Sequence, residues 1–110
     1  MPRPLSAKEH WLVTFLLTGT SYADRLLPCL PEQRVTEMAD GGMGSLQFYP
    51  PGLQGDRRFG DDVTEVWLKD EDEVPVLVTL LVDQHAQLFE LDVWKVDFSP
   101  TINLQIPSFI

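Results

Sequence analysis

The segment VPVLVTLLV, residues 74–82, is apolar at almost every position, and it decides the class of fold. Its one polar residue is Thr79. A strand with one solvated face alternates between apolar and polar residues, whereas a strand inside a sheet is apolar on both faces. Pro75 has no amide hydrogen and therefore belongs at the beginning of the strand. Residues 74–82 are predicted to form a central β-strand.

Other segments predict further strands, because their apolar residues alternate with period two. Glycines or charged residues separate these segments, and three glycines in residues 41–44 suit a tight hairpin turn. Strands joined by such short turns pair antiparallel. The predicted strands are residues 34–39, 45–49, 63–68, 74–82 and 88–98, with turns at 40–44, 69–73 and 83–86.

Two helices are predicted before the strands. Ser6 and Glu9 have the spacing of a capping box, which places the first helix start at Ser6 and lets it run to Thr18. Its apolar stripe is predicted to contain Trp11, Leu12, Phe15 and Leu16, and Val13 and Leu17 widen it. A shorter helix is expected from Ser21 to Leu27, where Pro28 stops it, and residues 28–33 are expected to be a connector.

Together these elements predict an α+β fold in a single domain, residues 1–110. Two N-terminal helices are expected to pack on one face of a mainly antiparallel sheet of about five strands. A chain of 110 residues is long enough to build one core without a metal or a disulfide. The tail, residues 102–110, is apolar enough that we expect it to dock on the domain.

Cysteine content and hydropathy point to a cytoplasmic protein. The one cysteine, Cys29, excludes an intramolecular disulfide. The apolar run Trp11–Leu17 is too short to cross a membrane, and residues 1–6 lack the features of a signal peptide.

The negative charge is concentrated in one third of the chain. The net charge is −9, and residues 59–92 contain ten acids against Lys69 alone, while seven acids and seven bases cancel elsewhere. Such a field repels nucleic acids and anionic membranes and attracts basic partners. The alternative interpretation is that the charge serves solubility alone.

Two segments carry a resemblance to a known family: residues 88–100, LFELDVWKVDFSP, and residues 40–46, DGGMGSL. The C-terminal segment resembles the signature of a family of small bacterial proteins of unknown function. The glycine-rich segment is similar to the hairpin of that family, and the similarity extends from the first helix to Pro100. The resemblance implies no catalytic residue. By analogy with other small bacterial proteins, it implies an immunity or accessory role.

The candidate partner-binding residues are Glu90, Asp92 and Trp94, which alternate on one face of the last predicted strand. Paired carboxylates beside an indole favour an Arg or Lys of a partner through ion pairing and cation–π contact. The acidic turn adds Asp70, Glu71 and Asp72 to the candidates. Two alternatives stay open: ion pairs within the chain to Arg57, Arg58 or Lys95, and acid–base catalysis by the carboxyl pair.

A pocket under the loop of residues 50–62 is the second candidate site. This loop is the longest stretch without a predicted element, and loops of that length are often functional. It contains Arg57 and Arg58, and we expect these to line a pocket with Trp67.

No catalytic, cofactor or metal site is predicted. His10 and His85 have no second histidine at metal-ligand spacing. Cys29 has no neighbouring base and is interpreted as a small apolar residue. Residues 41–44 lack the Gly-Lys-Ser/Thr of a phosphate loop.

Three functions therefore compete. The first is a non-enzymatic interaction module whose acidic sheet face binds a basic protein, as an immunity protein would. The second is a small-molecule binder or enzyme with a pocket under residues 50–62. The third is a homodimer that associates through a strand edge or through the apolar tail.

Overall fold

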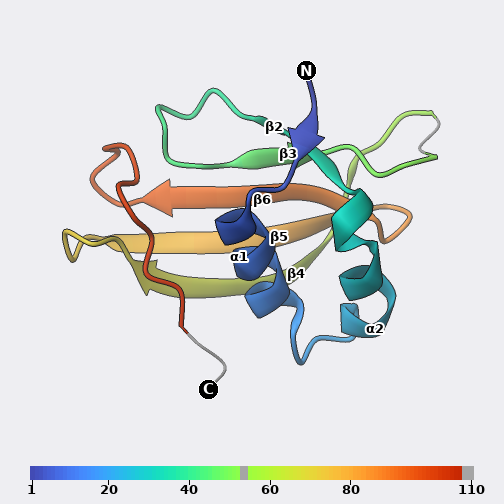
Figure 1. Cartoon of the computed structure of the whole chain (residues 1–110), viewed down its shortest axis with the longest axis horizontal. Helices are drawn as coiled ribbons and strands as arrows, with labels where there is room; N and C mark the ends of the chain where they lie inside the picture. The colour runs from blue at the N-terminus through green and yellow to red at the C-terminus, as the bar shows by residue number, and fades with distance from the viewer. Residues whose placement is uncertain (53–54, 108–110) are drawn as a thin grey trace.

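A computed structural model of the chain describes residues 1–52 and 55–107. It has an α+β fold with one antiparallel sheet of six strands in the order β1-β2-β3-β6-β5-β4 (Figure 1). The α+β class and the antiparallel sheet predicted from the sequence are confirmed. The strands are Arg3–Pro4 (β1), Arg34–Glu37 (β2), Leu46–Phe48 (β3), Phe59–Lys69 (β4), Pro75–Asp83 (β5) and Leu88–Lys95 (β6).

The sixth strand is β1, which the sequence analysis did not predict. Its two residues pair with the beginning of β2, Arg3 with Val35 and Pro4 with Arg34. The Arg3 guanidinium also binds Glu9 of the first helix, with Nη1 2.7 Å from Oε1. Two residues are too few to show a periodic pattern, so this strand depends on contacts that are distant in the sequence.

Strands β4, β5 and β6 form the long part of the sheet and lie side by side (Figure 1). The prediction that β4 begins at Val63 was wrong, because the strand begins at Phe59. Two register shifts, Phe59/Asp61 and Asp62/Thr64, carry the pairing through residues that do not alternate regularly. At Gly60 the backbone approaches β5 so closely that a Cβ would lie 2.1 Å from the carbonyl oxygen of Asp83. The absence of a side chain at Gly60 therefore lets β4 pair with β5 within residues 50–62, which were predicted to be a loop.

The first helix, α1, spans Ala7–Leu17, and the predicted capping box is present at its beginning. The Ser6 side chain accepts from the Glu9 amide, and the Glu9 carboxylate accepts from the Ser6 amide. The side chains that α1 buries are Leu12, Val13, Leu16 and Leu17. These four residues belong to the predicted stripe, whereas Trp11, which was also predicted to belong to it, is 37% exposed.

The second helix, α2, is the single turn Ala23–Leu26. It continues directly into a 3-10 helix, η1, over Leu27–Glu32. The predicted connector at residues 28–33 is therefore mostly 3-10 helix. Pro28 occupies the first turn of η1, where its missing amide hydrogen costs nothing.

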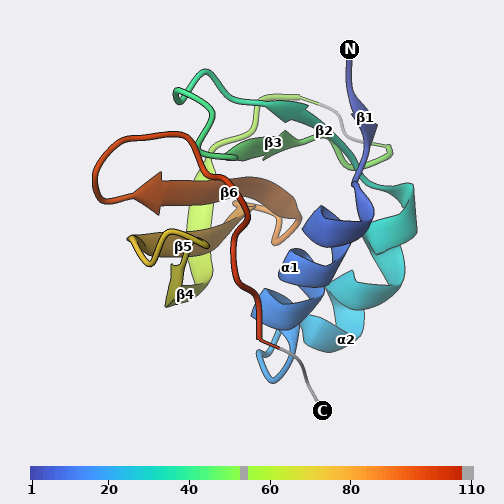
Figure 2. The same ribbon diagram turned by 60° about the vertical axis from the view of Figure 1, so that its left-hand side comes forward.

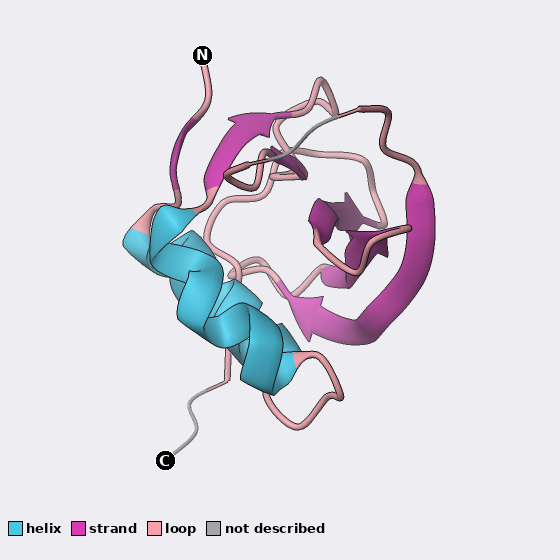
Figure 3. Ribbon diagram, turned by 90° about the vertical axis from the view of Figure 1, so that its right-hand side faces the viewer, coloured by secondary structure: helices cyan, strands magenta, loops and turns pink. Residues whose placement is uncertain are grey.

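One hydrophobic core fills the space between the helices and one face of the sheet. The helices lie on one side of the curved sheet (Figure 3), and Leu12 and Leu16 share the core with Val78 and Leu80 of β5. Phe48, Leu88 and Leu91 complete it from the neighbouring strands. No helix in the described residues is long and apolar enough to cross a membrane.

The C-terminal tail docks on the domain through residue 107, as predicted, whereas residues 108–110 of the predicted tail lie outside the described part. It descends beside α1 in both ribbon views (Figures 1 and 2). Leu104 is buried in the core, and the Gln105 amide donates to the carbonyl of Lys69 at 2.9 Å. This bridge lies at the end of β4.

The close approach at Gly60 generates a stability prediction. We expect Gly60→Ala to lower the free energy of unfolding by about 1–3 kcal/mol, because the new methyl group must push β4 away from β5. Gly41→Ala is the control: its Cβ would meet no atom within 4 Å, and only its positive φ is unfavourable. Urea denaturation measures both changes. A Gly60→Ala variant as stable as the Gly41→Ala variant would contradict the prediction.

Candidate functional site

The candidate site is the sheet face that points away from α1, which we call the open face. Residues of β4, β5 and β6 lie across it in rows set by the strand register. One row is Glu65–Thr79–Asp92, and the next is Trp67–Leu77–Trp94. A third row holds Asp62, Leu81 and Glu90. Alternation sends the intervening side chains, such as Val66, Val78 and Val93, to the core side.

Four carboxylates gather on the open face: Asp62, Glu65, Glu90 and Asp92. Among the described residues, no Lys or Arg lies within ion-pair distance of any of them. The face itself supplies polar contacts: the Thr79 hydroxyl donates to Glu65 Oε2 at 3.3 Å, and Glu90 and Asp92 share a hydrogen bond. The face therefore presents negative charge that the described part of the chain does not neutralise.

Glu90 and Asp92 lie where the charged form of each carboxyl is unfavourable. Partial burial raises the pKa of Glu90, and repulsion from Asp92 raises it further. Partial burial also raises the pKa of Asp92, with a repulsive contribution from Asp62, while a hydrogen bond to Glu90 opposes the rise. A cation at this point would favour the charged form of both carboxyls.

An exposed aromatic cluster borders the carboxylates. The Trp67 and Trp94 rings lie 6.2 Å apart between centroids, and the Phe98 ring lies 6.0 Å from Trp94. The three side chains are exposed by 57%, 40% and 69% in that order. The three rings therefore form a contiguous, exposed apolar cluster, a feature that singly scattered apolar side chains do not produce.

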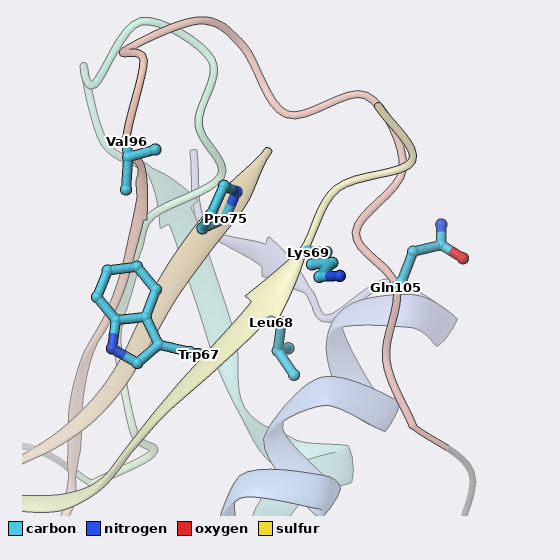
Figure 4. A pocket seen from close by; sticks show the side chains of 6 residues that line it. All are labelled: Trp67, Leu68, Lys69, Pro75, Val96 and Gln105. Atoms are coloured by element: carbon cyan, nitrogen blue, oxygen red, sulfur yellow. The ribbon is translucent and has the colours of Figure 1, made fainter. Parts of the chain in front are cut away.

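A wide, open pocket of about 680 Å³ continues from Trp67 around the end of β4. Trp67 and Leu68 project from opposite sides of β4, with Leu68 on the side of α1 (Figure 4). Pro75, Val96 and Gln105 line the rest of the pocket together with Lys69. Its surface is mainly apolar, so it suits an apolar group.

The acidic turn is placed differently from Glu90 and Asp92. Asp70 is buried and accepts from Lys95 Nζ at 2.7 Å, and the Lys95 side chain is fully buried. Lys95 Nζ also donates to Asp72 at 2.7 Å. The Asp70 carboxylate further accepts from the amides of Ile102 and Asn103, both at 2.7 Å. The structure thus buries Asp70, binds the partly exposed Asp72 to the same lysine and leaves Glu71 exposed.

Burial by itself would raise the pKa of Asp70. The hydrogen bonds from Lys95 and from three backbone amides outweigh that effect and hold the pKa well below its usual range. A carboxyl with a depressed pKa in the folded state stabilises the fold above its unfolded pKa, about 4, and loses that contribution as the pH falls. This carboxylate therefore stabilises the fold at neutral pH.

Arg57 is also held inside the fold. Its Nε donates to Asp83 Oδ2 at 2.8 Å, and its two terminal nitrogens donate to the carbonyls of Phe48 and Leu88. Its guanidinium carbon lies 5.1 Å from the centre of the Phe89 ring.

The structure does not bring the three predicted pocket residues together. Arg57 binds the last residue of β5, whereas Trp67 pairs with Leu77 near the beginning of that strand. Arg58 is exposed. A pocket of about 150 Å³ does lie beneath Pro50 and Pro51, but it is lined by other residues, including Arg25, Cys29, Gln33 and Leu88.

Sequence reasoning named Glu90, Asp92 and Trp94 as candidates but not the acidic residues of β4 that share their face. Asp62 and Glu65 lie within the acidic segment 59–92, yet their proximity to β6 depends on the register of β4 with β5. The signal that could have indicated Glu65 is the repeated spacing Glu65-x-Trp67 and Asp92-x-Trp94 in two strands of the sheet. No group of three or more metal-ligating side chains occurs in the part of the chain that the structure describes.

A family model described as a domain of unknown function (DUF6984) matches residues 2–106 of the chain. No curated protein and no solved structure matches the chain significantly. The resemblance stated from the sequence agrees with the family match in its extent and in the absence of a known function.

The buried pair of Lys95 and Asp70 generates a stability prediction. We expect Lys95→Met to lower the free energy of unfolding by about 3–5 kcal/mol, because it leaves a buried carboxylate without its cation. The matched control is Lys69→Met, which breaks the exposed pair with Glu73 and should change stability by less than about 1 kcal/mol. Guanidinium denaturation at pH 7 distinguishes the two variants. Equal losses would show that the Lys95 charge is not needed.

The raised pKa values of Glu90 and Asp92 predict that removing their charges stabilises the fold, whereas removing the charge of Lys95 destabilises it. A carboxyl whose pKa is raised by folding destabilises the fold above that pKa, and the penalty disappears as the pH falls through it. We therefore expect Glu90→Gln combined with Asp92→Asn to raise the melting temperature at pH 7 and to have little effect at pH 3. Glu32→Gln, at an exposed residue of η1, is the control. A lower melting temperature of the double variant at pH 7 would contradict this interpretation.

Proposed function

The chain belongs to the family described as a domain of unknown function (DUF6984), and we propose that it is a non-enzymatic protein-interaction module. Its open face binds a basic partner protein. The observation that carries the proposal is the gathering of four carboxylates, with no base of the described residues paired to them, next to an exposed aromatic cluster. Charged and aromatic groups in this combination are what protein interfaces use for steering and for anchoring.

The use of charge elsewhere in the chain supports the proposal. Arg57 and Lys95 are paired with Asp83 and Asp70 in contacts that are almost fully buried. Although Lys95 belongs to the same strand as Glu90 and Asp92, it points to the other side and does not neutralise them. The carboxylates of the open face are thus left for a cation from outside the chain.

The unfavourable position of Glu90 and Asp92 supports the same conclusion. Residues that lower stability are expected where a fold serves binding. A partner's cation between the two carboxylates would remove their repulsion at the moment of binding. The charges of Glu90 and Asp92 would then favour binding of the partner while they lower the stability of the free chain.

A basic domain is the partner that this surface fits, in the way that an immunity protein fits a cationic toxin. The Trp67, Trp94 and Phe98 rings would supply the anchor, and the carboxylates would supply the steering field. The pocket bordered by Trp67 and Pro75 would take an apolar side chain from the same partner.

Charge reversal tests the proposal. We expect Glu90→Lys combined with Asp92→Lys to abolish capture of a basic partner from a lysate of the source cells, because repulsion replaces attraction at the centre of the face. The control reverses two acids on the helical side, Asp24→Lys with Glu32→Lys, which are both exposed and which change the net charge equally. Quantitative mass spectrometry of the captured proteins compares the three chains.

The supporting result is a basic protein that the unaltered chain and the control both capture and that the Glu90/Asp92 variant does not. The captured protein should then bind the purified chain with an affinity that falls as salt is added. Equal capture by all three chains would contradict the proposal, because the charges of Glu90 and Asp92 would then not be needed. Equal loss by both variants would also contradict it, because only total charge would then matter.

A further inference from the structure

We propose that the open face recognises arginine, rather than positive charge in general. The inference rests on the proposed function and names the chemistry of the partner. The partner's guanidinium groups would lie against the Trp67 and Trp94 rings while donating to the neighbouring carboxylates of Glu65 and Asp92.

The placement of these four residues carries the inference. Glu65 precedes Trp67 by two residues on β4, and Asp92 precedes Trp94 by two residues on β6. Residues two apart on a strand point to the same face with Cα atoms about 6–7 Å apart. Thr79 and Leu77 of β5 separate the two pairs, so the face holds one carboxylate–indole pair on each side of a central strand.

Both indoles are accessible to a planar cation. The tilt between the Trp67 and Trp94 rings is 54°, and a large part of each residue is exposed. A guanidinium within about 6 Å of such a ring is attracted by the π electrons. Its remaining hydrogens point outward in its own plane, where the adjacent carboxylate can accept them.

The chain binds its own Arg57 by the same two kinds of contact. That guanidinium lies over the Phe89 ring at 5.1 Å and donates to the Asp83 carboxylate at 2.8 Å. The aromatic–carboxylate combination therefore holds an arginine elsewhere in this fold. On the open face the combination occurs twice, and no arginine of the described residues lies there within ion-pair distance.

Arginine and lysine differ in how they would use this face. The guanidinium is planar and weakly hydrated, so it can stack on an indole and still donate two parallel hydrogen bonds to one carboxylate. The lysine ammonium is strongly hydrated and acts as a point charge. It gains the attraction of the carboxylates, but it gains less from the rings.

Three blocked pentapeptides test the inference: glycine peptides with two arginines, two lysines or two citrullines at alternate positions. Each is titrated into the ¹⁵N-labelled chain at low ionic strength, and the indole N–H signals of Trp67 and Trp94 report binding. Trp11 on α1 serves as the internal reference. We expect the arginine peptide to bind at least about threefold more tightly than the lysine peptide, and the neutral citrulline peptide to bind much more weakly than either.

Two variants separate the inference from the proposed function. Trp67→Leu with Trp94→Leu should reduce arginine binding to the lysine level, as followed by backbone amide signals, and Glu65→Gln with Asp92→Asn should weaken both peptides. Equal binding of the arginine and lysine peptides to the unaltered chain would overturn the inference and leave the proposed function standing. Failure of both charged peptides to bind would overturn both. If the tryptophan variant does not fold, the comparison of the peptides on the unaltered chain decides.

Discussion

The rest of the structure depends on the buried ion pair between Lys95 and Asp70. Lys95 ends β6 and Asp70 directly follows β4, so the pair fixes the ends of the long strands relative to each other. Two charges removed from water are tolerated only when hydrogen bonds satisfy their remaining capacity. The amides of Ile102 and Asn103 supply those bonds to Asp70, and the Pro100 carbonyl accepts from Lys95. The same pair therefore fixes the course of the tail.

The tail in turn connects parts of the fold that are far apart in the sequence. Thr101 donates from its amide to the Gly42 carbonyl and from its hydroxyl to the Met43 carbonyl. Leu104 then enters the core, and Gln105 pairs with the end of β4. The helices and the tail cover the same side of the sheet, and the opposite side of β4, β5 and β6 is the open face (Figure 2).

Two groups of acidic residues thus lie in different environments. Asp70, Asp72 and Asp83 are bound to the buried cations Lys95 and Arg57, and their contacts stabilise the folded state. Glu90 and Asp92 lie on the open face, where burial and repulsion make their charged forms unfavourable. The net charge of −9 is therefore unevenly distributed, because carboxylates without a paired base in the described residues lie together beside an aromatic cluster.

The sequence by itself determined the local features: the capping box of Ser6 and Glu9, the central strand of residues 74–82, and the position of Glu90, Asp92 and Trp94 on one face of the last strand. Each of these follows from neighbours within a few residues, where periodicity and side-chain chemistry act. Only the tertiary structure decided that β4 begins at Phe59, that β1 joins the sheet, and that Asp62 and Glu65 lie near β6. Strand register sets these contacts, and register depends on residues that meet only after the chain has folded. The sequence likewise placed Asp70 in an acidic turn, but its burial is stable only because the fold brings Lys95 of β6 within 2.7 Å of its carboxylate.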